Sequence, residues 1–181
     1  MSQLLSPFPV FIFGSFLYRS DLFQNIDIEE IWNSKLGKSF EFSHNYFPMK
    51  DYYSKEMGTP DLLSRIIFVS PVPVLRDGLT SLKLWSDSIE KSNSTPQGNR
   101  LLNLDIGYIS LENVVLATGK SFSHRVYLQS GVYADLTYFY EDKTFKAFSW
   151  TYPDYSHVEF VDFFNYMRSI LQKKISTSTQ K

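Results

Sequence analysis

The sequence predicts an α+β protein built on a mainly antiparallel sheet, and three observations support this class. Residues 10–105 read as strand, helix, strand, strand, helix and strand, the β-α-β-β-α-β order of a ferredoxin-like unit. Residues 123–140 have the alternation and the central glycine of a β-hairpin. A long amphipathic segment follows. We therefore expect the first unit to be extended by C-terminal β-hairpins and a final helix.

Each element of the first region has its own local signal. Strands are marked by β-branched and aromatic residues or by period-2 alternation, and helices by apolar residues three or four positions apart. We first expect a strand over 10–17 and then a helix that begins at Asp21 or Asp27, ends at Gly37 and carries Ile28, Ile31, Trp32 and Leu36. An alternating strand over 40–46, a loop over 47–61 and a strand over 65–69 should follow. The region should close with a helix carrying Leu75, Leu79, Leu82 and Ile89, a polar loop over 92–99 and a strand over 101–105.

The segment over 111–118 supports two interpretations. Ser110 is a suitable cap for a short helix that Gly119 would end. The same residues are rich in β-branched side chains, which favours a strand. Both alternatives stay open.

The last helix has a clearer start. Ser156 and Glu159 form the pattern of a capping box, and the apolar face that follows carries Val161, Phe164, Met167 and Leu171. No linker or internal repeat divides the chain. We expect one α+β domain over residues 1–175 and a flexible tail over 176–181.

The composition limits the classes of function. With 18 basic and 19 acidic side chains the net charge is −1, which gives no general attraction for nucleic acid or an anionic membrane. The absence of cysteine excludes disulfides and cysteine-ligated metals. Aromatic residues make up 17% of the chain, and we expect most of them to fill the core. The apolar run over 4–18 is broken by Pro7, Pro9 and Gly14, so it predicts a strand rather than a signal peptide, and we expect a soluble, cytoplasmic protein.

The hairpin register brings two charged residues together. A three-residue loop over 129–131, with Gly131 at positive φ, would set Leu128 opposite Val132. Arg125 then lies directly across from Asp135, and the apolar side chains gather on the other face. A two-residue loop would mix polar with apolar residues on both faces, so we prefer the longer loop.

Several polar residues near this hairpin form a candidate site. Lys120, Arg125 and Asp135 supply charge, and His124, Tyr127 and Asp105 supply further donors and proton-transfer groups. An exposed cross-strand ion pair contributing under ~1 kcal/mol explains Arg125 and Asp135 equally well. His124 falls on the face opposite Arg125, and a half-buried structural histidine is its commoner role.

Five ordered blocks of the chain resemble a prokaryotic family called domain of unknown function 4416. They are PVFIFGSFLY, FPMKDYYSKEMG, NLDIGYISL, LATGKSFSHRVYL with SGVYADLTYFY, and WTYPDY. The resemblance brings no established activity. It maps the family's polar blocks onto Asp51, Tyr52, Tyr53, Glu56, Asp105, Lys120, His124, Arg125, Asp135, Tyr152 and Asp154. The family usually has proline where this chain has Ile106, which implies a different turn before Gly107. Asp154 also has a structural interpretation, in the turn and first-turn dipole of the last helix.

Some members of that family carry a GTP-binding label, which Gly119-Lys120-Ser121 superficially supports. A phosphate-binding loop of this type needs its first glycine where this chain has Val114, and it must open a helix. A hairpin is expected after Lys120, and no N-K-x-D guanine-reading segment occurs. We interpret the triplet as accidental.

Metal and nucleophile signals are weak. His44, His124 and His157 are isolated, although Asp51, Glu56 and Asp105 have the oxygen ligands that a hard cation such as magnesium prefers. No serine stands in a nucleophile-elbow motif, and no particular cofactor is indicated.

The sequence leaves two functions in competition. One is a site for a phosphorylated or otherwise anionic small molecule such as a nucleotide, with Arg125 positioned by Asp135 and with Lys120, Tyr52, Tyr53 and Glu56 nearby. The alternative is a non-catalytic interaction module that presents an aromatic face, including Tyr52, Tyr53, Tyr152 and Tyr155. The pattern does not decide whether the protein is an enzyme, nor its oligomeric state.

Overall fold

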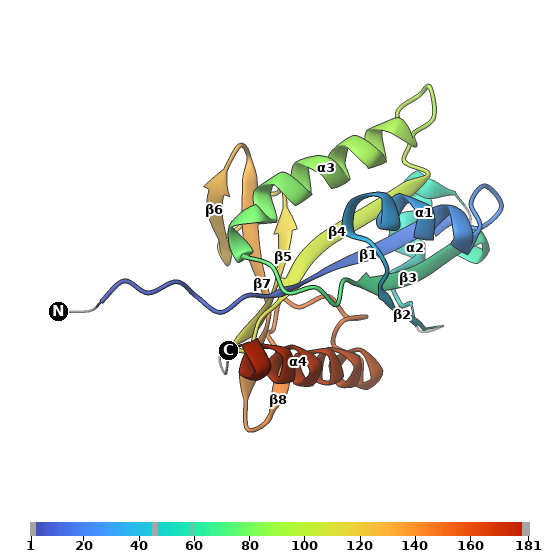
Figure 1. The fold of residues 1–181 in the computed structure, drawn as a ribbon. Coiled ribbons are helices and arrows are strands. Elements are labelled where there is room, and N and C mark those ends of the chain that lie inside the picture. Colours follow the sequence, from blue (N-terminus) through green and yellow to red (C-terminus); the bar gives the residue numbers. More distant parts are fainter. Residues whose placement is uncertain (1–2, 45–46, 59, 179–181) are drawn as a thin grey trace.

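A computed structural model describes residues 3–44, 47–58 and 60–178, which form four α-helices and one antiparallel sheet of eight strands (Figure 1). The strand order is β2-β3-β1-β4-β5-β7-β6, and β8 pairs with β7 off this path. The elements are β1 (Phe11–Arg19), α1 (Asn25–Leu36), β2 (Phe40–Ser43), α2 (Lys50–Met57), β3 (Leu63–Val69), α3 (Leu79–Ser92), β4 (Leu102–Ile109), β5 (Asn113–Thr118), β6 (Arg125–Gln129), β7 (Val132–Glu141), β8 (Thr144–Ala147) and α4 (Val158–Ser178).

The first four strands follow the predicted order of elements. Helix α1 connects β1 to β2, and α3 connects β3 to β4. The strands stand as β2-β3-β1-β4 with every neighbouring pair antiparallel. The ferredoxin-like comparison remains an interpretation of this order. The prediction of a plain loop over 47–61 is wrong, because α2 lies within it and buries Met57 against Leu17 and Leu63.

Helices cover both faces of the sheet, α1 and α3 on one and α4 on the other (Figure 1). Trp32 of α1 packs against Phe16 and Phe68 of the sheet, at ring-centroid distances of 6.3 and 5.9 Å. Under α4, Phe164 meets Phe13 edge-on at 5.1 Å. These aromatic side chains are almost fully buried, so packing is their main role.

The structure decides the segment that the sequence left open. Residues 113–118 form strand β5 and pair with β7. Gly107 lies inside β4, so no turn precedes it and the expectation of an altered turn at Ile106 is wrong. The alternating strand expected over 40–46 ends at Ser43, and residues 45–46 lie outside the described part of the chain.

The last helix begins at Val158 without the predicted box. The Ser156 hydroxyl donates to the Tyr152 carbonyl, and the Glu159 carboxylate lies 2.5 Å from the imidazole of His44. Helix α4 continues to Ser178, so the expected tail overlaps its last turn, and residues 179–181 lie outside the described range. None of the helices seen in the described residues is long and apolar enough to cross a membrane.

Candidate functional site

The predicted pairing of Arg125 with Asp135 is confirmed, but the predicted three-residue loop and the pairing of Leu128 with Val132 are wrong, because Gln129 lies opposite Val132. Arg125 pairs with Asp135, and Tyr127 pairs with Tyr133. The turn contains only Ser130 and Gly131, with φ of 53° and 77°. Positive φ at both positions suits a two-residue hairpin turn, and a bulge at Leu128 restores the register that a longer loop would have set.

Arg125 and Asp135 form a largely buried pair rather than an exposed one. The Arg125 Nε lies 2.8 Å from Asp135 Oδ2, and the two side chains are only 11% and 8% exposed. Arg125 Nη1 also donates to the carbonyl of Lys120 at 3.2 Å. The guanidinium therefore ties the end of β5 to the hairpin.

His124 lies with Val126, Ala134 and Leu136, on the face that alternation predicted, and it also approaches the ion pair. Its Nε2 lies 3.5 Å from Asp135 Oδ2, and its ring stacks on Trp150 at a centroid distance of 4.9 Å. His124 precedes the first residue of β6, so the alternation of the strand does not keep its ring away from Asp135.

We predict strong energetic coupling between Arg125 and Asp135. Arg125→Glu and Asp135→Arg should each destabilise the protein, because each leaves a largely buried charge facing a like charge. The double swap should recover stability by a coupling of about 0.5–3 kcal/mol, measured by urea denaturation. The exposed pair Lys91 and Asp87, with side chains 75% and 47% exposed, is the control and should couple by under about 0.5 kcal/mol. Additive effects at Arg125 and Asp135 would contradict the register.

A cleft of about 520 Å³ opens where β4 and β5 separate. The two strands pair at Gly107–Ile109 with Val114–Leu116, so among the described residues no strand pairs with the first half of β4 on that side. The cleft brings together residues from distant segments: Tyr52 and Tyr53 from α2, Lys83 and Glu90 from α3, Arg100, Asn103 and Asp105 on and before β4, Lys120 after β5, and Tyr152 before α4.

This geometry unites part of the predicted site. Tyr52, Tyr53, Asp105 and Lys120 line the cleft. Glu56, Arg125 and Asp135 are not among its lining residues, although Glu56 bonds Arg100 and Arg125 bonds the Lys120 carbonyl. Tyr127 is 57% exposed on β6 and packs against Tyr133, and His124 lines a separate apolar cavity with Trp150.

Arg100 organises one wall of the cleft, and the sequence interpretation missed it. Its Nε and Nη2 donate to the two carboxylate oxygens of Glu56 at 2.8 and 2.7 Å, and its Nη1 donates to Asn103 Oδ1 at 2.6 Å. The hydrogen bond with Glu56 raises the pKa of Arg100 and lowers the pKa of the Glu56 carboxyl. Glu56 therefore holds Arg100 in place and does not face the cleft as a free carboxylate.

Glu90 supplies a hydrogen-bond acceptor on the side of β4 that faces the cleft. Its Oε1 accepts from the backbone N–H of Leu104 at 3.0 Å, on the unpaired side of β4. Burial raises the pKa of the Glu90 carboxyl, while Lys83, the Leu104 amide and Arg100 act against that shift. The carboxylate thus satisfies a backbone group that would otherwise be unpaired.

Two groups in the cleft stay available to a ligand. Asp105 accepts a hydrogen bond from Asn103 Nδ2 at 3.1 Å, which leaves further acceptor positions on its carboxylate. Among the described residues, no hydrogen bond or ion pair engages the exposed ammonium of Lys120. Burial raises the pKa of Tyr53 and of Tyr152, and Asp105 adds to both shifts, so both rings carry neutral hydroxyls at neutral pH.

The Gly119-Lys120-Ser121 segment does not have the geometry of a phosphate-binding loop. It follows β5 and leads into the β6 hairpin, with no helix after it. The Lys120 amide donates to Thr118 Oγ1 at 3.2 Å instead of joining a ring of free amides. Within the described residues, no three histidine or acidic side chains are grouped to hold a metal.

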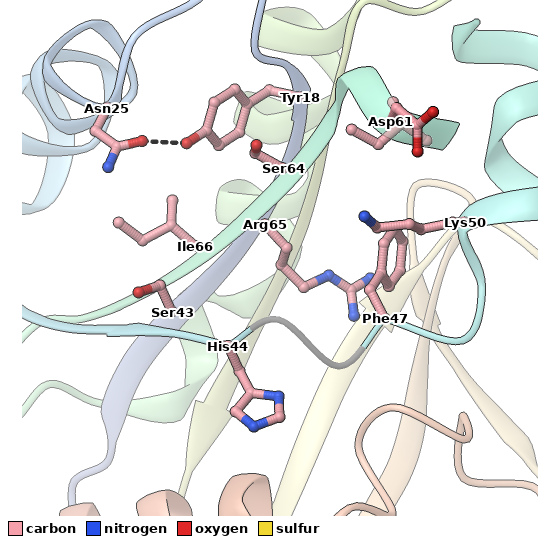
Figure 2. A pocket seen from close by; sticks show the side chains of 11 residues that line it. Tyr18, Asn25, Ser43, His44, Phe47, Lys50, Asp61, Ser64, Arg65 and Ile66 are labelled. Carbon is pink, nitrogen blue, oxygen red and sulfur yellow. Dashed lines mark hydrogen bonds between the residues drawn. The ribbon is translucent and has the colours of Figure 1, made fainter. Parts of the chain in front are cut away.

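A second cavity, of about 390 Å³, is lined by Arg65, Phe47 and Tyr18 among others (Figure 2). Arg65 projects from β3, and its guanidinium lies 4.4 Å from the centre of the Phe47 ring. It forms an ion pair with Asp154, and the two side chains are only 5% and 1% exposed. Because Asp154 neutralises this cation, we assign the pair to the stability of the fold.

Asp154 thus has more than the role in the turn that the sequence suggested. It lies in the turn before α4, and its Oδ1 accepts from the Tyr155 amide at 3.0 Å. Its pairing with Arg65 joins that turn to β3 and was not predicted.

The fold and the cleft define an α+β protein whose open antiparallel sheet parts between β4 and β5 to form a polar site. The chain belongs to the family described as Domain of unknown function (DUF4416), which matches residues 9–171. No curated protein and no solved structure matches the chain.

Proposed function

We propose that the protein binds a phosphorylated or otherwise anionic small molecule in the cleft between β4 and β5. The observation that supports this proposal is the exposed ammonium of Lys120, which acts on Glu56 only through its charge and has no hydrogen bond or ion pair among the described residues, whereas the other cations that line the cleft are paired. An ammonium on a flexible stem is suited to a phosphate or carboxylate group.

The rest of the cleft suits a ligand that also carries hydroxyl groups and a flat ring. Asp105 has free acceptor positions for hydroxyl or amino groups. Tyr52, which is 56% exposed, and Tyr152, which is 38% exposed, offer ring faces for a base or a sugar. A nucleotide or a sugar phosphate combines these features.

Arg125 supports this site in a different way from the one the sequence suggested. Asp135 occupies its Nε, and the carbonyl of Lys120 occupies its Nη1. Arg125 therefore positions the segment that carries Lys120, and Lys120 is the residue that would contact the anion.

The competing proposal, an aromatic interaction surface, loses part of its basis. Tyr155 is only 2% exposed, and Tyr53 is partly buried against Phe47. Tyr52 and Tyr152 remain at the surface, and both line the cleft. Their placement favours a small ligand over a broad protein contact.

Calorimetric titration with nucleotides, sugar phosphates and dicarboxylates, with and without magnesium, tests the proposal. At least one anion should bind, and Lys120→Ala should weaken it by roughly tenfold to a hundredfold, the worth of one charge-assisted hydrogen bond. Lys173→Ala, which removes an exposed lysine of α4, is the matched control and should leave the affinity unchanged. Asp105→Asn should weaken a nucleotide or a sugar phosphate more than inorganic phosphate. If every anion fails to bind, or if Lys120→Ala binds as well as the unmodified protein, the proposal is wrong.

A further inference from the structure

An apolar groove lies on the part of the sheet that α1 and α3 leave uncovered. Two adjoining cavities of about 410 and 430 Å³ share Tyr108 and Ala134 and run over β5, β7 and β6. Val126 and Trp150 at this groove are 67% and 40% exposed. Apolar side chains that gather on an open sheet face usually mark a contact surface.

The segment over 3–9 has the composition to fill such a groove. It carries no charged residue, and Leu4, Leu5 and Phe8 are 97%, 76% and 53% exposed. It extends away from the rest of the protein as an arm (Figure 1). Exposing three large apolar side chains to water on one short arm is unfavourable unless another surface covers them.

The arm starts at the rim of the groove. The carbonyl of Phe8 accepts from Arg76 Nη2 at 3.0 Å, and Arg76 lines the groove beside Tyr108. Pro7 and Pro9 fix their own φ and hold the residues before them in extended conformations. The arm is therefore directed outward from the rim, with a reach of about 23 Å for its seven residues when extended.

The edge of the sheet beside the groove is also open. Strand β6 is the last strand in the order of the sheet, and no strand in the described part of the chain pairs with its other side. In an extended arm, Leu4, Ser6 and Phe8 direct their N–H groups to one side, and Pro7 and Pro9 lack N–H groups on the other. The arm can thus add to one sheet edge but cannot continue pairing beyond it, which limits the assembly.

We propose that the arm of one copy of this chain docks in the groove of a second copy, which returns its own arm in exchange. Because the arm and the groove adjoin on the same face, a two-fold axis near Arg76 places each arm over the other copy's groove and closes the dimer. The ligand site between β4 and β5 is not involved, so this inference is independent of the proposed function.

Sedimentation equilibrium of the full chain tests the proposal. The molar mass measured for the unmodified protein should be twice the 21.1 kDa of one chain. An arm variant, Leu4→Glu with Leu5→Glu, and a groove variant, Val126→Glu, should each weaken the dimer by at least roughly a hundredfold. Leu84→Glu, which places the same charge on an exposed apolar position of α3, is the control and should leave the dimer intact.

Mixing the two defective variants distinguishes exchange between copies from an arm that folds back on its own groove. The arm variant retains an intact groove and the groove variant an intact arm, so the mixture should form a heterodimer held by one contact. A monomeric unmodified protein up to about 100 μM, a dimer that survives both variants, or a mixture that yields no heterodimer would each overturn the proposal.

Discussion

Asp154→Ala is expected to destabilise the protein by about 3–5 kcal/mol, because it leaves the guanidinium of Arg65 buried without its counter-charge. The Arg65 side chain is only 5% exposed, so water compensates poorly for the lost carboxylate. Phe47 and Tyr155 flank the cation at 4.4 and 6.0 Å, and their rings compensate only in part. Urea denaturation at neutral pH measures the loss.

Two comparisons make this expectation specific. Asp87→Ala removes a carboxylate that pairs with Lys91 at the surface and should change stability by less than about 1 kcal/mol. Replacing both members of the buried pair, Arg65→Met with Asp154→Leu, should recover most of the loss, since apolar side chains of similar size often replace a buried ion pair without net cost. A loss below about 1 kcal/mol for Asp154→Ala would mean that the pair is solvated in solution.

Gly107→Ala is expected to cost on the order of 3 kcal/mol, the upper part of the range for overpacking a core. An added Cβ would lie 2.4 Å from the carbonyl oxygen of Val115 and 2.7 Å from the Phe13 ring. Neither neighbour can yield easily, because Val115 belongs to β5 and Phe13 packs edge-on against Phe164. The contact also lies in the short stretch that joins β4 to β5.

Gly78→Ala is the matched control for this substitution. No atom lies within 4 Å of the Cβ that would be added there, so the change should be neutral or slightly stabilising. Thermal denaturation of both variants measures the difference, and hydrogen exchange at β5 should accelerate in Gly107→Ala alone. Equal stabilities of the two variants would show that β4 and β5 move apart without cost.

The hairpin illustrates what a local pattern can predict. The alternation of apolar and polar residues in 123–140 required Arg125 to face Asp135, because any slip by one residue would turn apolar side chains to the polar face. The pattern did not reveal that a bulge at Leu128 and a two-residue turn together achieve this register. A bulge adds one residue without changing the side-chain pattern beyond it, so periodicity cannot distinguish it from a longer loop.

The cleft shows the opposite case. Asp105 alternates with buried apolar residues of β4, and this polar position in an apolar strand was visible in the sequence. Arg100 and Glu90 gave no local signal, because their roles come from Glu56 in α2 and from the free edge of β4. Helix α2 was missed for a related reason: at eight residues it is too short for its periodicity to be recognised.

By itself, the sequence determined the α+β class, the order of strands and helices in residues 10–105 apart from α2, the pairing of Arg125 with Asp135 and the membership in the family. Each of these follows from the apolar period of one segment or from blocks of neighbouring residues. Only the tertiary structure decided that β4 and β5 separate, that Arg65 pairs with Asp154, and that Lys120 and Asp105 line the same cleft. A local period reports which side of an element is apolar, but which element covers that side depends on contacts between residues far apart in the chain.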